Sequence, residues 1–321
     1  MTPKSVADER TQKEKFFDRW FRVAEVANEA LKKDKDISHI LDGLQLLAEN
    51  KQVTAGIKKE ASVDWLTKIL TAERRAHRAF FGGVFDLTEF ANTLKKYGRK
   101  KVRFWRSLGL EPHFLPRMSM LAGNDYDGWK IKPEEWFFKK QVEGKLFRNV
   151  GGELKKILTL ELEGITVLID TRLKPVYDNG RQMWENDNLL GEIIESARKS
   201  GRIEKYENGQ QSSRFGVSAN EWEVAIRPAL AAKLGLEINQ VRLETTTERN
   251  AIPQIYPHMP RKDDGKTDTS VWVEENLESR GGRLFGGSSG LGGLADVDYG
   301  GADYHWDSRS FRSLAVLSLG N

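Results

Sequence analysis

The chain has 321 residues, of which 39% are hydrophobic and 31% charged, including nine Trp and fifteen Phe. This composition is typical of a globular protein, and the length is enough for two domains of roughly 150 residues, each with its own core. The formal net charge is only +4, and cysteine is absent, which excludes disulfides, thiolate zinc sites and cysteine nucleophiles.

Membrane and export signals are missing from the sequence pattern. The opening stretch, MTPKSVADERTQKEK, contains no apolar run of signal-peptide length. No later stretch approaches the roughly eighteen apolar residues that a membrane-spanning helix needs. We therefore expect an intracellular, cytoplasmic protein with no membrane contact.

The front of the chain has the pattern of amphipathic helices, because apolar residues recur there at three- and four-residue spacing. The predicted helices cover residues 11–33, 37–48, 63–81 and 87–97. Gly82, Gly83 and Gly98 are the predicted stop signals. We interpret residues 1–150 as a helical N-terminal region, whose role stays open, with a connector of short elements over 101–148.

A local basic cluster lies at the end of this region, where Lys and Arg alternate with aromatic side chains. Its basic members are Lys95, Lys96, Arg99, Lys100 and Lys101. Such a cluster could contact nucleic acid, with bases stacked on the aromatics. The alternative is a helix C-terminus whose cations favour the negative end of the helix dipole, followed by a strand of alternating charge. We prefer this alternative, although the first 110 residues do carry a surplus of Lys and Arg.

A second domain is expected over residues 151–321. Two β-rich runs in ILTLELEGITVLID are broken at Glu163-Gly164, which predicts a hairpin or a bulged strand pair. Residues 188–199 form a predicted helix that ends at Gly201. Ser218 and Glu221 have the spacing of a capping box, which predicts a second helix from there to about Leu234.

The remainder of the chain predicts short strands and one long loop. QVRLETTT and TSVWVEEN are β-type runs, residues 281–301 are glycine-rich, and SFRSLAVLSL is a final strand. Strands, two helices and further strands make the fold class α+β. A loop of about twenty residues in a compact domain is usually functional or disordered, and we favour function here.

Motifs of enzymes and cofactor sites are weak. Ser288 stands in a G-x-S-x-G match, but the strand before it and the helix after it that a nucleophile elbow requires are not predicted. A hydrolase that uses Ser288 is therefore only an alternative, and we expect no enzyme. No phosphate-binding loop occurs, and no cofactor is expected. The histidines are scattered without an i, i+4 pair, so no metal site is expected. They are His39, His77, His113, His258 and His305.

The most informative segment is DVDYGGADYHWDSRS, residues 296–310, in which Asp, Tyr, His and Ser are crowded together. The codons GAC, TAC, CAC and AGC for these residues each differ from the Asn codon AAC by replacement of a single adenine. A loop rich in Tyr, Ser, Gly and Asp also has the composition of an antibody paratope. The alternative is an ordinary polar loop.

Taken together, GGRLFGGSSGLGGLADVDYGGADYHWDSRSFRSLAVLSL resembles the C-terminal variable region of diversity-generating retroelement variable proteins. The resemblance covers roughly residues 154–319 and is strongest after Gly282. In that family a reverse transcriptase randomises adenines of a template repeat, and the copy overwrites the 3′ end of the gene. The resemblance implies a C-type-lectin fold, shared with formylglycine-generating enzymes, after the N-terminal helical unit. The enzymatic relatives use cysteine chemistry, which this chain lacks.

The resemblance places a variable region at about residues 281–313 and implies two groups of residues. The expected variable, ligand-binding residues are Ser288, Ser289, Asp296, Asp298, Tyr299, Asp303, Tyr304, His305, Asp307 and Ser308. The expected scaffold residues are Trp306, Phe311, Arg312 and Leu314. Tyr299, Tyr304 and Trp306 are candidates for contact area, and the aspartates would favour a basic partner. The ligand would be an unknown protein or other macromolecule. The alternative partner is nucleic acid, bound through the basic N-terminal region.

Overall fold

The computed structural model describes residues 64–122, 128–150, 152–171, 187–259, 270–278, 282–287 and 293–317. The chain divides into two compact units, Met1–Val63 and Asp64–Asn321, and every element described below belongs to the second. The division therefore falls at residue 63 and not near residue 150, where the sequence placed it. The helices expected at 11–33 and 37–48 lie outside the described residues.

Two helices open the second unit, as the apolar spacing predicts. Helix α3 spans Trp65–Phe81 and ends at Gly82, which has the left-handed conformation. Helix α4 spans Thr88–Ser107, and Gly98 interrupts it with φ 79° and ψ 160°. A residue with a Cβ is strained at that φ, so glycine allows the kink. The expected stop at Gly98 is thus a kink, and the chain continues as helix where the sequence predicted a strand of alternating charge.

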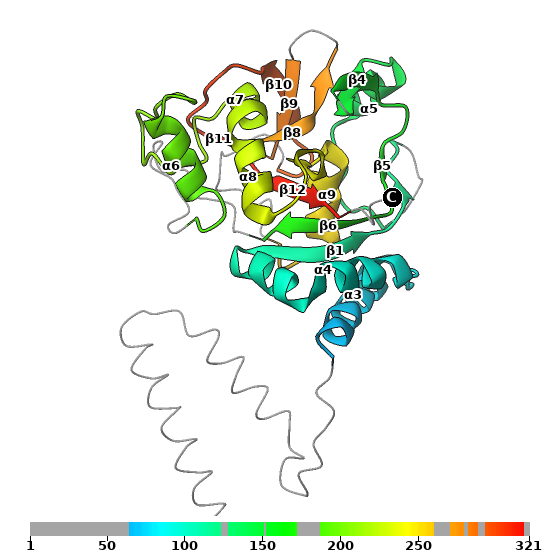
Figure 1. Ribbon diagram of the computed structural model, residues 1–321. Helices are drawn as coiled ribbons and strands as arrows, with labels where there is room; N and C mark the ends of the chain where they lie inside the picture. The colour runs from blue at the N-terminus through cyan, green and yellow to red at the C-terminus, as the bar shows by residue number, and fades with distance from the viewer. Residues whose placement is uncertain are drawn as a thin grey trace, which may run out of the picture. The chain divides into compact units, whose positions relative to one another are not determined.

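A four-stranded antiparallel sheet explains why residue 150 is no boundary. Its order is β1 (Leu110–Leu115), β6 (Ile165–Asp170), β12 (Ser313–Val316) and β7 (Val241–Leu243). Strand β1 precedes residue 150 and pairs along its whole length with β6, which follows it. In Figure 1, α4 and α3 lie along β1 on the side away from the rest of the unit. The N-terminal helices of this unit and the later strands therefore share one core.

The hairpin expected around Glu163-Gly164 does not form. Strand β5 (Glu161–Leu162) pairs with β2 (Met118–Ser119), whereas β6 pairs with β1 and β12. Strand β6 lies between two neighbours and is buried from residue 166 to residue 170. A local hairpin would leave one edge of this apolar strand unpaired, and pairing with two strands distant in sequence avoids that.

A second, larger sheet contains the glycine-rich segment. Its order is β10 (Val297–Gly301), β9 (Gly282–Gly286), β8 (Ser270–Leu277), β3 (Leu146–Val150) and β4 (Glu153–Lys156), and β11 (Arg309–Phe311) pairs in parallel with β8. TSVWVEEN is a strand as predicted, and the final predicted strand is divided into β11 and β12 at Arg312. The expectation of one long loop over 281–301 was wrong in part, because β9 and β10 pair within it.

Most of the remaining helices lie between β6 and β8 in sequence. They are α6 (Gly191–Lys199), α7 (Ala219–Glu221), a π-helical turn (Trp222–Ile226), α8 (Arg227–Leu234) and a 3₁₀ turn (Ile238–Gln240) before β7. Helix α5 (Glu135–Val142) comes earlier, before β3. The predicted capping box is confirmed, because the Ser218 hydroxyl accepts from the Glu221 N–H and the Glu221 side chain accepts from the Ser218 N–H. The predicted stop at Gly235 is confirmed by its left-handed conformation.

Helix α9, Thr246–Ile255, replaces the second half of the expected strand QVRLETTT. Within this run the strand is limited to β7, Val241–Leu243. Thr245 caps the helix through a second capping box with Glu248, so two backbone N–H groups at its start are satisfied. The β-branched threonines favoured a strand, but the cap and the burial of the helix outweigh that preference.

The four-stranded sheet separates two hydrophobic clusters. On β6, Leu168 belongs to the cluster with α4, α6 and α8, while Val167 and Ile169 belong to the cluster with α5 and α9. Successive side chains of a strand point to opposite faces, so an unbroken apolar run fits a sheet covered on both sides. Helices combined with antiparallel sheets make this an α+β unit, as expected. Within the described parts of the chain, no helix combines the length and the apolar character needed to cross a bilayer.

Candidate functional site

Most of the expected variable residues lie on one exposed segment, which comprises β10 and the loop that joins it to β11. We call this segment the 298–307 surface and define it by its exposed side chains: Asp298, Tyr299, Asp303, Tyr304, His305, Trp306 and Asp307. Ser308 is only partly exposed. Ser288 and Ser289, including the proposed hydrolase nucleophile, lie outside the described residues.

Exposed aromatic side chains are concentrated on this surface. Tyr299 is 54% exposed, Tyr304 61% and Trp306 45%. In the described part of the chain, Phe104 is the one other aromatic side chain exposed to a similar degree. The rings of Tyr304 and Trp306 meet edge to face at 6.4 Å between centroids, and the ring of Tyr299 contacts Trp136 at 6.3 Å. Trp306 was expected to be a scaffold residue, but nearly half of its surface is exposed to solvent.

The backbone of the loop accepts hydrogen bonds from α7 and from the residues that precede it. Gly216 N–H donates to the Trp306 carbonyl at 3.2 Å, and Asn220 N–H donates to the Ala302 carbonyl at 3.1 Å. The Tyr206 hydroxyl donates to the carbonyl of Asp307 at 3.1 Å. Because these bonds end on main-chain oxygens, they do not depend on which side chains the loop carries.

Side chains of the surface add bonds that do depend on residue type. Asn208 Nδ2 donates to Asp307 Oδ2 at 2.6 Å, and Asn220 donates to Asp303. His305 Nε2 lies 2.8 Å from the carboxylate of Glu221, which forms the capping box of α7 with Ser218. Asp303 and Asp307 are thus oriented by asparagines while they stay exposed. The surface presents fixed carboxylates beside its aromatic rings.

A buried arginine forms the floor of the surface. The Arg309 guanidinium carbon lies 4.5 Å from the ring centroids of Trp272 and Trp306, so it links the buried Trp272 to the exposed Trp306. Burial lowers the pKa of Arg309 to about 9, although the charges of Asp298 and Asp296 act in the opposite direction. Arg309 remains a cation at neutral pH and supports Trp306 from beneath.

Asp296 does not belong to the exposed set, in contrast to the expectation. It is buried, and its Oδ2 accepts from the Gly287 N–H at 3.0 Å. Gly286 packs so closely that a Cβ there would collide with the Asp296 carbonyl oxygen. The first glycine of the G-x-S-x-G match is therefore explained by strand packing between β9 and β10. The other expected scaffold residues, Phe311, Arg312 and Leu314, are buried.

The basic cluster lies on α4, where Lys95, Lys96, Arg99 and Lys100 are exposed. Lys101 is partly buried, and its ammonium lies over the rings of Phe104 at 5.5 Å and Trp105 at 5.7 Å. Four of the five proposed nucleic-acid contacts are thus accessible. Lys101 is engaged with the protein itself and is a poor candidate for a phosphate contact.

Three of the five histidines lie in one cluster, although their spacing did not predict it: His77 and His113 contact the buried carboxylate of Glu73, and His113 and His258 contact the partly exposed Glu111. Glu73 on α3 accepts from the Phe114 N–H at 2.8 Å, and its Oε2 lies 2.9 Å from His113 Nδ1. His77 Nε2 is 3.2 Å from Glu73, and His258 Nε2 is 3.2 Å from Glu111. Burial acts against ionisation of Glu73 and His113. Their mutual attraction and hydrogen bonds nevertheless lower the pKa of Glu73 to about 2 and raise that of His113 to about 9.

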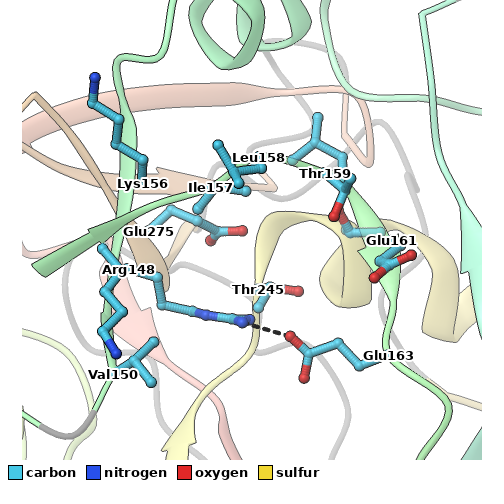
Figure 2. A pocket seen from close by; sticks show the side chains of 13 residues that line it. Arg148, Val150, Lys156, Ile157, Leu158, Thr159, Glu161, Glu163, Thr245 and Glu275 are labelled. Atoms are coloured by element: carbon cyan, nitrogen blue, oxygen red, sulfur yellow. Dashed lines mark hydrogen bonds and ion pairs between the residues drawn. The ribbon is translucent and has the colours of Figure 1, made fainter.

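A pocket of about 260 Å³ lies between β3, β4 and the start of α9. Figure 2 shows the Arg148 guanidinium directed at Glu163, with Thr245 and Glu275 also among the lining side chains. Burial raises the pKa of Glu275 to about 7, despite the hydrogen bond from the Thr246 N–H. Ligand pockets usually measure about 300–1,000 Å³, so this pocket is small for an organic ligand.

Comparisons with protein-family models, with curated proteins and with solved structures find no match to this chain. The assignment of a function therefore rests on the geometry above. Of the three groups, the 298–307 surface gathers exposed aromatic and acidic side chains, the histidine cluster gathers metal-type ligands, and the pocket is small and polar. The first is best suited to contact a macromolecule.

Proposed function

We propose that this protein binds a macromolecular ligand through the 298–307 surface, and that a retroelement diversifies this surface on a C-type-lectin scaffold. The observation that carries the proposal is the concentration of exposed aromatics there. Tyr299, Tyr304 and Trp306 lie within eight residues, and such side chains on a protein surface usually mark an interaction site. Tyr and Trp contribute rigid contact area with little loss of conformational entropy.

The separation of side chains from framework supports the diversification part of the proposal. The loop is held by bonds to its own carbonyls from Tyr206, Gly216 and Asn220. Strands β11 and β12, which follow it, are buried in the two sheets. Exposed side chains on a fixed loop can change while the core beneath them stays the same. An α+β arrangement whose last strand is central in a sheet is consistent with the proposed scaffold.

The charge of the surface points to a basic ligand. Asp298, Asp303 and Asp307 are exposed among the aromatic rings, and Glu204 lies beside His305 at 3.4 Å. Carboxylates around aromatic anchors attract cationic partners and steer their approach. We propose a lysine- or arginine-rich protein surface as the ligand of this particular sequence. The role is one of binding, without turnover.

A display experiment tests the proposal. A library randomised at Asp298, Tyr299, Asp303, Tyr304 and Asp307 would be selected against a panel of purified basic proteins. A matched control library would be randomised at the equally exposed positions 153–156 of β4. We expect specific binders from the first library alone, with affinity that weakens as salt is raised. Binders from both libraries, or from neither, would contradict a dedicated ligand surface.

A second candidate function has one observation in its favour, the exposed basic face of α4. Lys95, Lys96, Arg99 and Lys100 could each neutralise a phosphate. Nucleic-acid binding of this kind loses affinity steeply as salt rises. Replacing the four side chains by Gln would abolish such binding, whereas Lys101→Gln would change it little because Lys101 packs on its own aromatic neighbours. Equal loss from both variants would argue against a direct phosphate contact.

A further inference from the structure

The histidine cluster contains three side chains with the chemistry of a metal site. Glu111 and His113 are two residues apart on β1, so they project from the same face of the strand. His258 follows the end of α9 and reaches the same place. One ligand atom from each of the three residues lies within 4.8 Å of the others. The fold thus brings together groups that are 147 positions apart in sequence.

The distances in this group match those between the ligands of a tetrahedral metal ion. Zn²⁺ binds imidazole nitrogen and carboxylate oxygen at about 2.0–2.2 Å, which places neighbouring ligand atoms about 3.3–3.6 Å apart. Glu111 Oε2 lies 3.3 Å from His113 Nε2 and 3.2 Å from His258 Nε2. Two edges of the tetrahedron are therefore almost formed. The third needs only a movement of His258, whose side chain is 58% exposed.

The surroundings of His113 favour a metal on its Nε2 atom. Its Nδ1 lies 2.9 Å from the buried carboxylate of Glu73, where the Nδ1–H donates. Metal-bound histidines usually donate their second N–H in this way, which fixes the tautomer and the ring orientation. Glu73 is itself held by the Phe114 N–H and by the hydroxyl of Tyr256. His113 is thus oriented by a rigid carboxylate, with its other nitrogen toward Glu111 and His258.

Charge and ligand type favour a transition-metal ion over a hard cation. The carboxylates of Glu111 and Glu73 would balance the charge of a divalent ion bound to two neutral imidazoles, and Arg106 at the edge of the site adds one positive charge. Imidazole ligands suit Zn²⁺, whereas Mg²⁺ and Ca²⁺ prefer oxygen ligands. Arg106 is 3.9 Å from Oε1 of Glu111 and leaves Oε2 for the ion. On binding, the ion would replace the Nε2 proton of His113.

We propose that Glu111, His113 and His258 bind one Zn²⁺ ion, with Glu73 as the residue that orients His113. The exposure of His258 leaves room for water as the fourth ligand. The ion would join β1 to the chain after α9, and through Glu73 both are joined to α3. This site is separate from the 298–307 surface and does not depend on the function proposed for it.

Zinc binding by the untagged full-length chain tests the proposal. Titration calorimetry with Zn²⁺ alone, after treatment with a chelator, should give one ion per chain, and Mg²⁺ should give no binding. His258→Ala and Glu111→Gln each remove a ligand and should weaken Zn²⁺ binding by about 100-fold or more. Glu73→Gln should weaken it by about 10- to 100-fold, the usual effect of losing an orienting partner. Circular dichroism would show that each variant is folded, and exposed His258 is the safest position to change.

His305→Ala is the matched control, because the imidazole of His305 also lies beside glutamates, Glu204 and Glu221. It offers a single imidazole, so its loss should leave Zn²⁺ affinity unchanged. Absence of stoichiometric binding by the parent chain would overturn the proposal, and the cluster would then be an ion-pair network only. Binding that survives in His258→Ala, or that is lost in His305→Ala, would overturn it as well.

Discussion

Replacing Glu275 by Gln should remove a specific pH dependence of stability. Glu275 lines the pocket in Figure 2 and is buried on β8. Its two oxygens accept from the Thr246 N–H at 2.9 Å, at the start of α9. Burial nevertheless raises its pKa from 4.5 to about 7. Gln keeps a carbonyl oxygen for Thr246 and cannot ionise.

The size of the effect follows from the two pKa values. Below about pH 4.5 the carboxyl is protonated in both folded and unfolded chains. As the pH rises toward 7, the unfolded chain releases its proton while the folded chain keeps it, so the stability present at low pH is lost through this range. A shift of one pKa unit corresponds to about 1.4 kcal/mol, so the whole loss is about 3.4 kcal/mol, of which about 2.5 kcal/mol falls between pH 5 and pH 8.

Urea unfolding of the parent chain and of Glu275→Gln, measured at about pH 5 and about pH 8, tests this value. Other carboxylates contribute equally to both proteins, so the difference between them isolates Glu275. We expect the free energy of unfolding of the parent to fall relative to the variant by about 2.5 kcal/mol between the two pH values. A difference that is constant with pH would refute the reasoning, and it would mean that the bonds from Thr246 keep Glu275 ionised.

Three further predictions concern stability. Asp296→Ala should lower the free energy of unfolding by about 1–3 kcal/mol in a urea titration, because the half-buried Gly287 N–H loses the bond to the buried Asp296 carboxylate. No loss would restore Asp296 to the variable set. Tyr304→Asn should change the free energy of unfolding by less than about 0.5 kcal/mol, since the side chain is largely exposed. A large loss of stability in the same assay would make Tyr304 a framework residue. Arg214→Leu should lower the free energy of unfolding by about 3–5 kcal/mol, measured by thermal and urea denaturation, because the carboxylates of Asp170 and Asp187 lose a buried cation. Retention of full stability would contradict that pairing.

Local chemistry made some elements predictable. The end of α3 at Gly82 and the capping box at Ser218 depend on residues within one helical turn, and both are confirmed. Helix α9 was missed because its threonines are β-branched and follow a genuine strand. The Thr245-to-Glu248 spacing was a usable signal for its start, of the same kind as that at Ser218.

Features that depend on long-range pairing could not be predicted. Strand β6 pairs with β1, more than fifty residues earlier, and with β12 at the other end of the chain. No local pattern distinguishes these partners from a hairpin. Strands β9 and β10 were obscured by their glycines, of which Gly286 is required because a Cβ there would collide with the backbone of the neighbouring segment.

In the candidate sites, too, locally encoded features could be predicted and features that depend on long-range packing could not. Exposed aromatics at Tyr299 and Tyr304 agree with a composition that was visible in sequence. The burial of Asp296 beside Gly287 and the exposure of Trp306 above Arg309 depend on tertiary contacts that the composition does not reveal. The histidine cluster had only faint signals, the i, i+2 spacing of Glu111 and His113 and the i, i+4 spacing of Glu73 and His77. His258 joins them solely because α9 packs on α3 and Tyr256, just after α9, contacts His113 and Phe114 of β1.

Sequencing of the DNA around the gene tests the proposed function most directly. The account predicts a reverse-transcriptase gene and a near-copy of the 3′ end that differs mainly at adenines. The differences should fall in codons of the exposed residues Asp298, Tyr299, Asp303, Tyr304, His305 and Asp307, and spare those of Phe311 and Leu314, which are buried. Absence of the near-copy, or differences concentrated in codons of buried residues, would contradict a diversified ligand surface.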